Sequence, residues 1–266
     1  MHDKLLNILL QMIHEHVEGV TVMEGWQSRT LIGIWKPKKS QDTPKNLRMI
    51  SIMDSIQKII ESIFAERLAP LLQERIPQWQ GGGIRRREAA EIAFTLNRYL
   101  RMRKKLGKDT YCLFLDAVQA YDLIDRKILY ECLSKFGLDE QATNWVKSFH
   151  NGVTNMMDIN GEEVAVKSEM GVPQGSPVSP ALYVIFHFIT AEAYDVKHKR
   201  PPMIFKSGND GIISHPRGPS CCEGQGIVTD IGLLAFVDDT TILTESYQQI
   251  TNHAKWWIEH SGKFSS

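Results

Sequence analysis

The sequence has little of what several classes of protein require. Only four of its 266 residues are cysteine, and none of the four forms a Cys-x-x-Cys pair, which disfavours a zinc cluster or a disulfide scaffold. No apolar run reaches the roughly 18–20 residues of a membrane span, and no small-residue cleavage site follows the first apolar segment. We therefore expect an intracellular protein, in the cytoplasm or the nucleus, with no membrane partner and with reduced thiols.

Net charge is also absent, because Lys plus Arg and Asp plus Glu both number 31. This balance argues weakly against nucleic-acid binding, but the positive charge is unevenly distributed. Residues 85–108 hold nine basic side chains against Glu88 and Glu91, and residues 36–48 hold five against Asp42. Each cluster alone is compatible with a solvated helix face. Two clusters ahead of an acidic site fit a surface that follows phosphates better.

The remaining composition is that of an ordinary folded protein, with 42% hydrophobic and 23% charged residues. Helical periodicity is found at 4–17, 56–72, 88–105, 126–136, 139–149, 181–193 and 248–260. Short β-rich runs are found at 31–35, 49–52, 110–115, 155–159, 163–166, 233–237 and 240–244. Residues 200–226, rich in Gly, Pro and Ser, are predicted to be a loop with little structure of its own.

Two adjacent aspartates, Asp238 and Asp239, lie between apolar runs and are expected at the tip of a tight hairpin. Asp is common in turns for backbone reasons, so a plain turn is the simpler interpretation. Adjacent like charges repel, however, and this favours a cation that offsets them. Asp116 ends another apolar run, 110–115, which we expect to be a buried strand. If strand and hairpin are neighbours, Asp116 and Asp238 can share two divalent ions for a phosphoryl displacement.

A third segment, 171–180, reads Gly-Val-Pro-Gln-Gly-Ser-Pro-Val-Ser-Pro. One interpretation is a rigid loop before a helix, since Ser179-Pro180 suits a helix start. The functional interpretation uses Gly175 for a close backbone approach and Gln174 as an amide that hydrogen-bonds a sugar or a base edge.

These three segments, in this order, resemble the palm motifs of reverse transcriptases. Phe114-Leu-Asp-Ala-Val-Gln-Ala-Tyr-Asp122 is similar to the first motif, 171–180 to the second, and Phe236-Val-Asp-Asp239 to the third. Upstream, residues 26–38 and 48–68 resemble the fingers of non-LTR, LINE-like elements, so the resemblance covers most of the chain. Val237 replaces the Ala that is usual beside the carboxylates, and we expect this change to be tolerated.

The resemblance implies an α+β fold, the fingers and palm of a right-hand polymerase. Fingers would occupy residues 1–109 and the palm 110–266, with a small antiparallel sheet packed on helices. We also expect a fragment of a retroelement polyprotein that ends before the thumb.

The resemblance also implies roles for individual side chains. Asp116 and Asp238, supported by Asp239, would be the catalytic residues that hold two Mg²⁺ or Mn²⁺ ions. Tyr121 would be the steric gate that rejects a ribose 2′-hydroxyl, although a core aromatic is its simpler interpretation. Asp122 would make a structural hydrogen bond. The nucleotide would also contact Lys38 (or Lys36), Arg48, Gln174 and Gly175.

The activity implied is RNA-directed DNA polymerase, which adds dNTPs to a DNA primer on an RNA template. A group II intron reverse transcriptase, a non-catalytic or domesticated RNA-binding remnant and a viral RNA-dependent RNA polymerase are the alternatives. Arg48-Met-Ile-Ser favours the LINE type over the intron type, and the three aspartates argue against a remnant. The presence of Tyr121 and the absence of Gly-Asp-Asp count against the viral enzyme.

Overall fold

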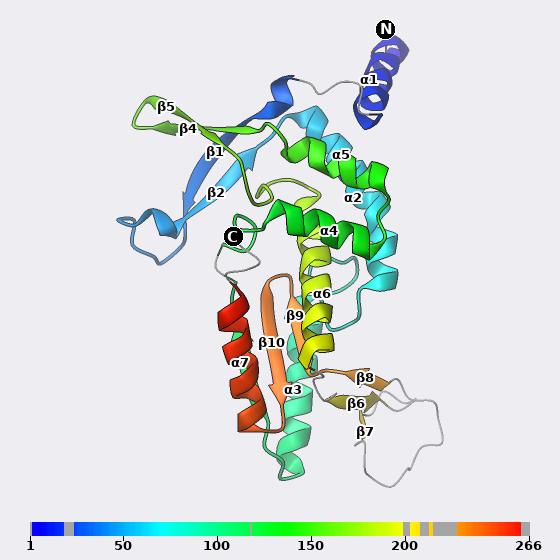
Figure 1. Ribbon diagram of the computed structural model, residues 1–266, viewed down its shortest axis with the longest axis vertical. Coiled ribbons are helices and arrows are strands. Elements are labelled where there is room, and N and C mark those ends of the chain that lie inside the picture. Colours follow the sequence, from blue (N-terminus) through cyan, green and yellow to red (C-terminus); the bar gives the residue numbers. More distant parts are fainter. Residues whose placement is uncertain are drawn as a thin grey trace. The chain divides into compact units, whose positions relative to one another are not determined.

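The computed structural model describes residues 2–18, 24–117, 119–198, 203–207, 213–214 and 228–261 (Figure 1). The chain divides into two compact units, each built from separated segments. The first unit takes the chain up to Pro70 together with 119–186, and the second takes 71–118 and 187–265. These units do not follow a single boundary after residue 109, so a division into fingers and palm at that point stays a prediction.

A four-stranded sheet dominates the first unit. Its order is β2-β1-β4-β5, with β1 antiparallel to β2 and parallel to β4. The strands are β1 (Ser28–Trp35), β2 (Leu47–Ile52), β4 (Thr154–Ile159) and β5 (Glu162–Lys167). Asn160 and Gly161 form the β4–β5 turn, both with positive φ, the conformation that a two-residue hairpin turn of this composition favours. The β-rich runs at 155–159 and 163–166 therefore pair as one hairpin.

The helices of the first unit begin and end at residues suited to these positions. They are α1 (His2–Val17), α2 (Ser55–Arg75) up to Pro70, α4 (Arg126–Phe136), α5 (Glu140–His150) and the first part of α6 (Ser179–His198). The Asp125 and Asp139 carboxylates accept hydrogen bonds from backbone N–H groups in the first turns of α4 and α5. Gly137, at φ 101°, ends α4. Leu129, Leu133, Leu182 and Ile185 are fully buried in this core.

The second unit is a three-stranded antiparallel sheet between helices. Its order is β3-β10-β9, from β3 (Tyr111–Leu115), β9 (Leu233–Phe236) and β10 (Asp239–Thr244). Leu243 packs with Tyr99 of α3 (Ala89–Lys105) on one face. Ile242 packs with Tyr194 of α6 and Trp256 of α7 (Tyr247–Ser261) on the other face. Figure 1 shows α6 and α7 in front of this sheet and α3 behind it. A small antiparallel sheet packed on helices is therefore confirmed.

Two expectations about strands were wrong. The run 110–115 forms β3 at the edge of its sheet, where β10 is its one neighbouring strand among the described residues, and Phe114 is 69% exposed. In the stretch 200–226, expected to be a loop, β6 (Ile204–Ser207) and β7 (Ile213–Ser214) pair and are joined by β8 (Val228–Asp230). The rest of that stretch, apart from Met203, lies outside the described residues. In the part of the chain that is described, no helix is long and apolar enough to cross a membrane.

Candidate active site

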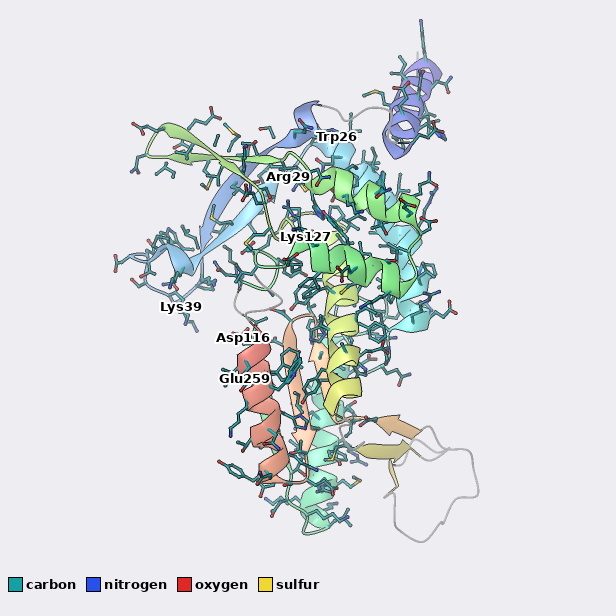
Figure 2. The ribbon with its side chains drawn as sticks, viewed as in Figure 1. Trp26, Arg29, Lys39, Asp116, Lys127 and Glu259 are labelled. Atoms are coloured by element: carbon teal, nitrogen blue, oxygen red, sulfur yellow. The ribbon has the colours of Figure 1, made fainter. Side chains whose placement is uncertain are left out.

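Three aspartates gather at one end of the second unit's sheet. Val237 and Asp238 form the two-residue turn between β9 and β10, and Asp239 is the first residue of β10. The register pairs Thr240 with Leu115, the last residue of β3, so Asp116 follows at the same end of the sheet. Figure 2 labels Asp116 there, next to the end of α7. Asp116 is therefore a neighbour of the distant Asp238-Asp239 pair, because β3 ends and β10 begins at the same end of the sheet.

The surface around these aspartates is open. Asp239, Thr241 and Leu243 alternate along β10 and share one face of the sheet. Leu243 is covered by α3, whereas Asp239 and Asp116 are exposed, and so is Phe114, the partner of Thr241. The helix thus covers one end of this face and leaves the carboxylate end accessible to a ligand.

The negative charges at this end of the sheet act on one another. Burial raises the pKa of Asp238, and the negative charges of Asp239 and Asp116 raise it further. Among the described residues, no group of three or more His, Cys, Asp or Glu side chains is placed to hold a metal ion alone. Mg²⁺ often takes only one or two carboxylates and completes its shell with water and substrate phosphates. Asp116 and Asp238 fit a site of that kind, and Asp239 is not grouped with them as a third ligand.

The backbone of the aspartate turn is held by residues that the sequence did not reveal. The Gln80 side chain accepts a hydrogen bond from Val237 N (2.9 Å) and donates one to Val237 O (3.0 Å). His187 Nε2 lies 2.9 Å from Thr240 Oγ1, which donates to the carbonyl of Asp238 (3.2 Å). A polar residue directly before three glycines, a few residues after the end of a helix, was the available signal for Gln80.

In the first unit, Asp122 and Gln174 form a pair. Gln174 Nε2 donates to both carboxylate oxygens of Asp122, at 3.1 and 3.2 Å. This confirms the structural hydrogen bond expected of Asp122. Burial raises the pKa of Asp122, while the bond from Gln174 and the positive charge of Lys36 oppose the rise. The Gln174 amide, predicted to hydrogen-bond a sugar or a base, thus has a partner within the protein.

Tyr121, the predicted gate, has its ring and its backbone fixed. The ring stacks on Tyr183, with centroids 5.2 Å apart and planes 15° apart. The Tyr121 carbonyl accepts a hydrogen bond from Val172 N (2.8 Å), which belongs to the loop 171–180. The Tyr121 side chain is nevertheless only half-buried. It therefore combines a core contact with a surface that a ligand could reach.

The loop 171–180 is anchored to β2 and α2. Gln174 O accepts a hydrogen bond from Ser51 N (2.7 Å). A Cβ at Gly175 would lie 2.5 Å from Ser51 O, so the close approach expected of Gly175 is made to this strand. Ser176 Oγ donates to the carboxylate of Glu61, whose pKa is raised by burial. Glu61 is a second residue whose role as an anchor the sequence did not reveal.

The three basic residues predicted to grip a triphosphate lie along the β1–β2 hairpin of the first unit. Lys38 is exposed in the turn with φ 61°, and Arg48 is exposed on β2. Figure 2 labels the neighbouring Lys39 at the tip of this hairpin. Of the two lysines left open, Lys36 is the one whose charge acts on Asp122. The predicted site residues thus form two groups, the three aspartates in the second unit and Tyr121, Gln174, Gly175 and the basic residues of the hairpin in the first unit.

The basic cluster at 85–108 divides into structural and exposed side chains. Arg87 donates to the backbone carbonyls of Ile76, Pro77 and Gln80. Arg103 is buried and pairs with Glu245. Exposed basic side chains of α3 remain, namely Arg98, Arg101, Lys104 and Lys105.

This architecture has known structural counterparts. Telomerase from Candida tropicalis in complex with a TWJ fragment of telomeric RNA is similar over 100% of this chain and 43% of that one, with a TM-score of 0.60 at 11% identity. Apo telomerase from the same species, truncated from its C-terminal domain, is similar over 92% of this chain and 49% of that one, at a TM-score of 0.56 and 14% identity. At these identities the likeness establishes the class of fold, that of the telomerase chain.

The sequence then defines the family. The family described as "Reverse transcriptase (RNA-dependent DNA polymerase)" matches residues 36–263, so the chain belongs to it. The probable RNA-directed DNA polymerase from transposon BS of Drosophila melanogaster is 27% identical over 208 residues, 74% of this chain and 22% of that protein. The RNA-directed DNA polymerase from mobile element jockey of the same fly is 27% identical over 69% of this chain and 20% of its own length. The chain thus spans about a fifth of these relatives.

Proposed function

We propose that this chain carries out RNA-directed DNA polymerisation, adding dNTPs to the 3′-hydroxyl of a DNA primer on an RNA template. The observation that carries the proposal is the placement of Asp116 and Asp238 at the open end of the β3-β10-β9 sheet in a member of the reverse transcriptase family. Relatives that are named RNA-directed DNA polymerases from mobile elements support a retroelement origin.

Asp116 and Asp238 would hold two divalent ions, Mg²⁺ or Mn²⁺, with Asp239 in a supporting role. The raised pKa of Asp238, caused by burial and by the two neighbouring carboxylates, supports a site that is completed by positive charge. When bound, such ions lower the pKa of the attacking hydroxyl and offset the charge of the pyrophosphate leaving group. The protein's own contribution is to fix the carboxylates at the sheet end and to leave that end open.

The first unit would hold the incoming nucleotide. Tyr121, fixed on Tyr183, would exclude a ribose 2′-hydroxyl by its volume. Lys36 or Lys38, with Arg48, would contact the triphosphate as cations. Gln174 and Gly175, anchored to β2, would line the nucleotide from the loop 171–180. The division into fingers (residues 1–109) and palm (residues 110–266) is part of this proposal, so Tyr121 and the loop 171–180 would belong to the palm although they lie in the first unit.

The exposed face of α3 would contact the phosphates of the nucleic acid. Four basic side chains are exposed along one helix, whereas the neighbouring Arg103 is occupied by Glu245. Exposed cations attract a phosphate backbone without regard to sequence, and such binding weakens with salt. Phe94, 68% exposed on the same helix, adds an aromatic surface on which a base can stack.

Primer extension tests the proposal. The chain is incubated with oligo(dT) on poly(rA), dTTP and Mg²⁺ or Mn²⁺, and extension is compared with that of Asp238→Asn and Asp116→Asn. We expect extension by the wild type and its loss in both variants. An Asp158→Asn variant, in the exposed β4–β5 hairpin, controls for the loss of one surface charge.

Binding of the template is measured in parallel with labelled poly(rA). Binding of poly(rA) by the wild type without extension under either metal would overturn the polymerase proposal in favour of an RNA-binding protein. Extension that survives Asp238→Asn would overturn the assignment of the site.

A further inference from the structure

The side chain of Gln80 recognises the backbone of the aspartate turn. Its oxygen accepts from Val237 N and Gly82 N, both at 2.9 Å, and its nitrogen donates to Val237 O at 3.0 Å. The same nitrogen lies 3.4 Å from His187 Nδ1. Gln80 is fully buried, and the amide has two hydrogens and two lone pairs, all of which these four contacts use. The reverse orientation of the amide would set N–H against N–H at Val237.

The backbone that Gln80 holds is strained. Val237 has φ 60°, a conformation that is rare for a β-branched residue. It is the first residue of a two-residue hairpin turn, a place where positive φ normally selects Gly. Such a conformation is unfavourable and persists only where neighbours impose it. The two hydrogen bonds from Gln80 to Val237 are the contacts placed to impose it.

A second line of hydrogen bonds reaches the next residue of the turn. His187 Nε2 lies 2.9 Å from Thr240 Oγ1, and Thr240 Oγ1 donates to Asp238 O. Gln80 therefore donates to His187 Nδ1, His187 donates to Thr240, and Thr240 donates to the backbone of Asp238. Burial lowers the pKa of His187 to about 4, so the imidazole is neutral at physiological pH, as this sequence of donors requires.

The segment that carries Gln80 is itself fastened to the sheet. Ala235 N donates to Trp79 O (2.7 Å) and Gly81 N donates to Ala235 O (2.8 Å), which extends the sheet alongside β9. A Cβ at Gly82 would overlap Val237 N and Cγ2, so only glycine allows this approach. Arg87 donates to the Gln80 carbonyl (3.0 Å) from the start of the following helix.

We propose that Gln80 is a positioning residue for catalysis: it imposes the strained turn at Val237 that aims the Asp238 carboxylate at the ions it shares with Asp116. The proposal rests on the proposed polymerase function. Gln80 touches neither substrate nor ion, and it acts through the backbone of Val237 and, through His187 and Thr240, of Asp238. A purely structural fastening is the competing explanation, and it predicts a loss of stability without a specific change in metal dependence.

The test uses Gln80→Leu, which removes the amide while keeping a similar volume. Extension is measured against Mg²⁺ concentration and against dTTP concentration, together with the melting temperature. We expect kcat to fall about 10²-fold, as small misplacements of reacting groups do. The Mg²⁺ concentration for half-maximal rate rises about tenfold, as when a residue that orients a metal ligand is lost. KM for dTTP changes less than about twofold, because the nucleotide contacts lie elsewhere.

A double-mutant cycle isolates the effect of the turn. Glycine adopts φ 60° without strain, so the turn in Val237→Gly depends less on its hydrogen bonds with Gln80. We expect Gln80→Leu to cost at least about fivefold less in kcat when it is made in the Val237→Gly background, a non-additivity that neighbouring sites can show. An equal cost in both backgrounds overturns the proposal. Gln78→Leu, an exposed glutamine two residues earlier, is the matched control and should behave as the wild type.

Two further measurements separate a failure of this proposal from a loss of folding and from a failure of the proposed function, which activity alone cannot do. Mn²⁺ binding, followed by electron paramagnetic resonance of the free ion, should weaken in Gln80→Leu. If Gln80→Leu does not fold, Thr240→Val removes only the hydroxyl that donates to Asp238 and should raise the Mg²⁺ requirement in the same direction. If the wild type extends the primer, and Gln80→Leu and Thr240→Val both behave like the control Gln78→Leu, this proposal is overturned while the proposed function stands. No extension and no Asp238-dependent Mn²⁺ binding by the wild type overturns the proposed function, and this proposal with it.

Discussion

The two groups of candidate residues are supported in opposite ways. In the second unit, the aspartate turn is held by an amide, a neutral imidazole and a hydroxyl, from Gln80, His187 and Thr240. In the first unit, the loop 171–180 and its surroundings are held by charged side chains. The contacts to the aspartate turn itself come from neutral side chains, and the cation Arg87 reaches this scaffold only at the carbonyl of Gln80. In the first unit a cation, Arg126, donates directly to the loop at Gly171.

Arg126 shows the second kind of support most clearly. Its guanidinium donates to the backbone carbonyls of His150, Ser168, Met170 and Gly171 and to the Ser168 hydroxyl. Burial lowers the pKa of Arg126, but the many acceptors satisfy it as a cation. A buried cation of this kind beside Asp238 would compete with a metal ion for the carboxylate, which explains why neutral groups serve there.

The largest predicted effect is at the carboxylates. Asp238→Asn keeps the size of the side chain and removes its charge, so we expect primer extension to fall by at least about 10³-fold, as loss of a principal electrostatic group does. Gln174→Ala in the first unit should cost much less, roughly tenfold. Both rates are measured by single-turnover extension at saturating dTTP. A larger loss in Gln174→Ala would break the comparison, since the chemistry would then depend more on the first unit.

A change of selectivity larger than the loss of rate is predicted for Tyr121. Tyr121→Ala removes the ring that stacks on Tyr183 and opens the space it fills. We expect the preference for dTTP over UTP to fall roughly 10²-fold, with dTTP incorporation reduced only a few-fold. Competitive incorporation of the two nucleotides measures the ratio. Tyr183→Phe is the control, because it keeps a ring for Tyr121 to stack on, and an unchanged ratio in Tyr121→Ala would favour the core-aromatic interpretation.

A smaller effect should separate the two lysines left open by the sequence. Lys36 acts electrostatically on Asp122, the partner of Gln174, whereas Lys38 is exposed in the hairpin turn. We expect Lys36→Gln to raise KM for dTTP about fivefold, the equivalent of about 1 kcal/mol, and Lys38→Gln to change it less than about twofold. Steady-state kinetics at fixed salt decides between them. The reverse order would assign the triphosphate contact to Lys38.

The sequence was sufficient for features that depend on local pattern. The turn at Asn160-Gly161 follows from its residue types. Two apolar runs that end in carboxylates predicted that Asp116 and Asp238 meet on the condition that strand and hairpin are neighbours, and the pairing of β3 with β10 meets that condition. The sequence was insufficient where a residue's partner is distant along the chain, or where the burial of a strand depends on the elements beside it. Gln80 hydrogen-bonds the backbone of Val237, 157 positions along the chain, and no spacing in the sequence predicts a contact over that separation. The run that forms β3 has the same composition at a sheet edge as in a sheet centre, so its exposure was misjudged.

The smallest predicted effect tests the charge balance at the aspartate turn directly. The pKa of Asp238 is raised in the folded chain by burial and by Asp239 and Asp116. The ionised carboxylate therefore destabilises the folded state at any pH above that raised pKa, and this cost disappears as pH falls through it. Without metal at pH 7, Asp238→Asn should then melt higher than the wild type, by roughly 1–3 °C.

Two controls make this last effect specific. Below the pKa that Asp238 has in the unfolded chain, about 4, the two proteins should melt together, because the wild-type carboxyl is then protonated in both the folded and the unfolded state. Added Mn²⁺ should raise the melting temperature of the wild type more than that of Asp238→Asn, since a ligand stabilises only the form that binds it. Asp122→Asn serves as the matched change in the first unit, where Lys36 already opposes the rise in pKa. Added Mn²⁺ should raise the melting temperature of Asp122→Asn as much as that of the wild type. If it raises it as little as that of Asp238→Asn, the contrast between the two units fails, because cation demand would then not be confined to the carboxylate end.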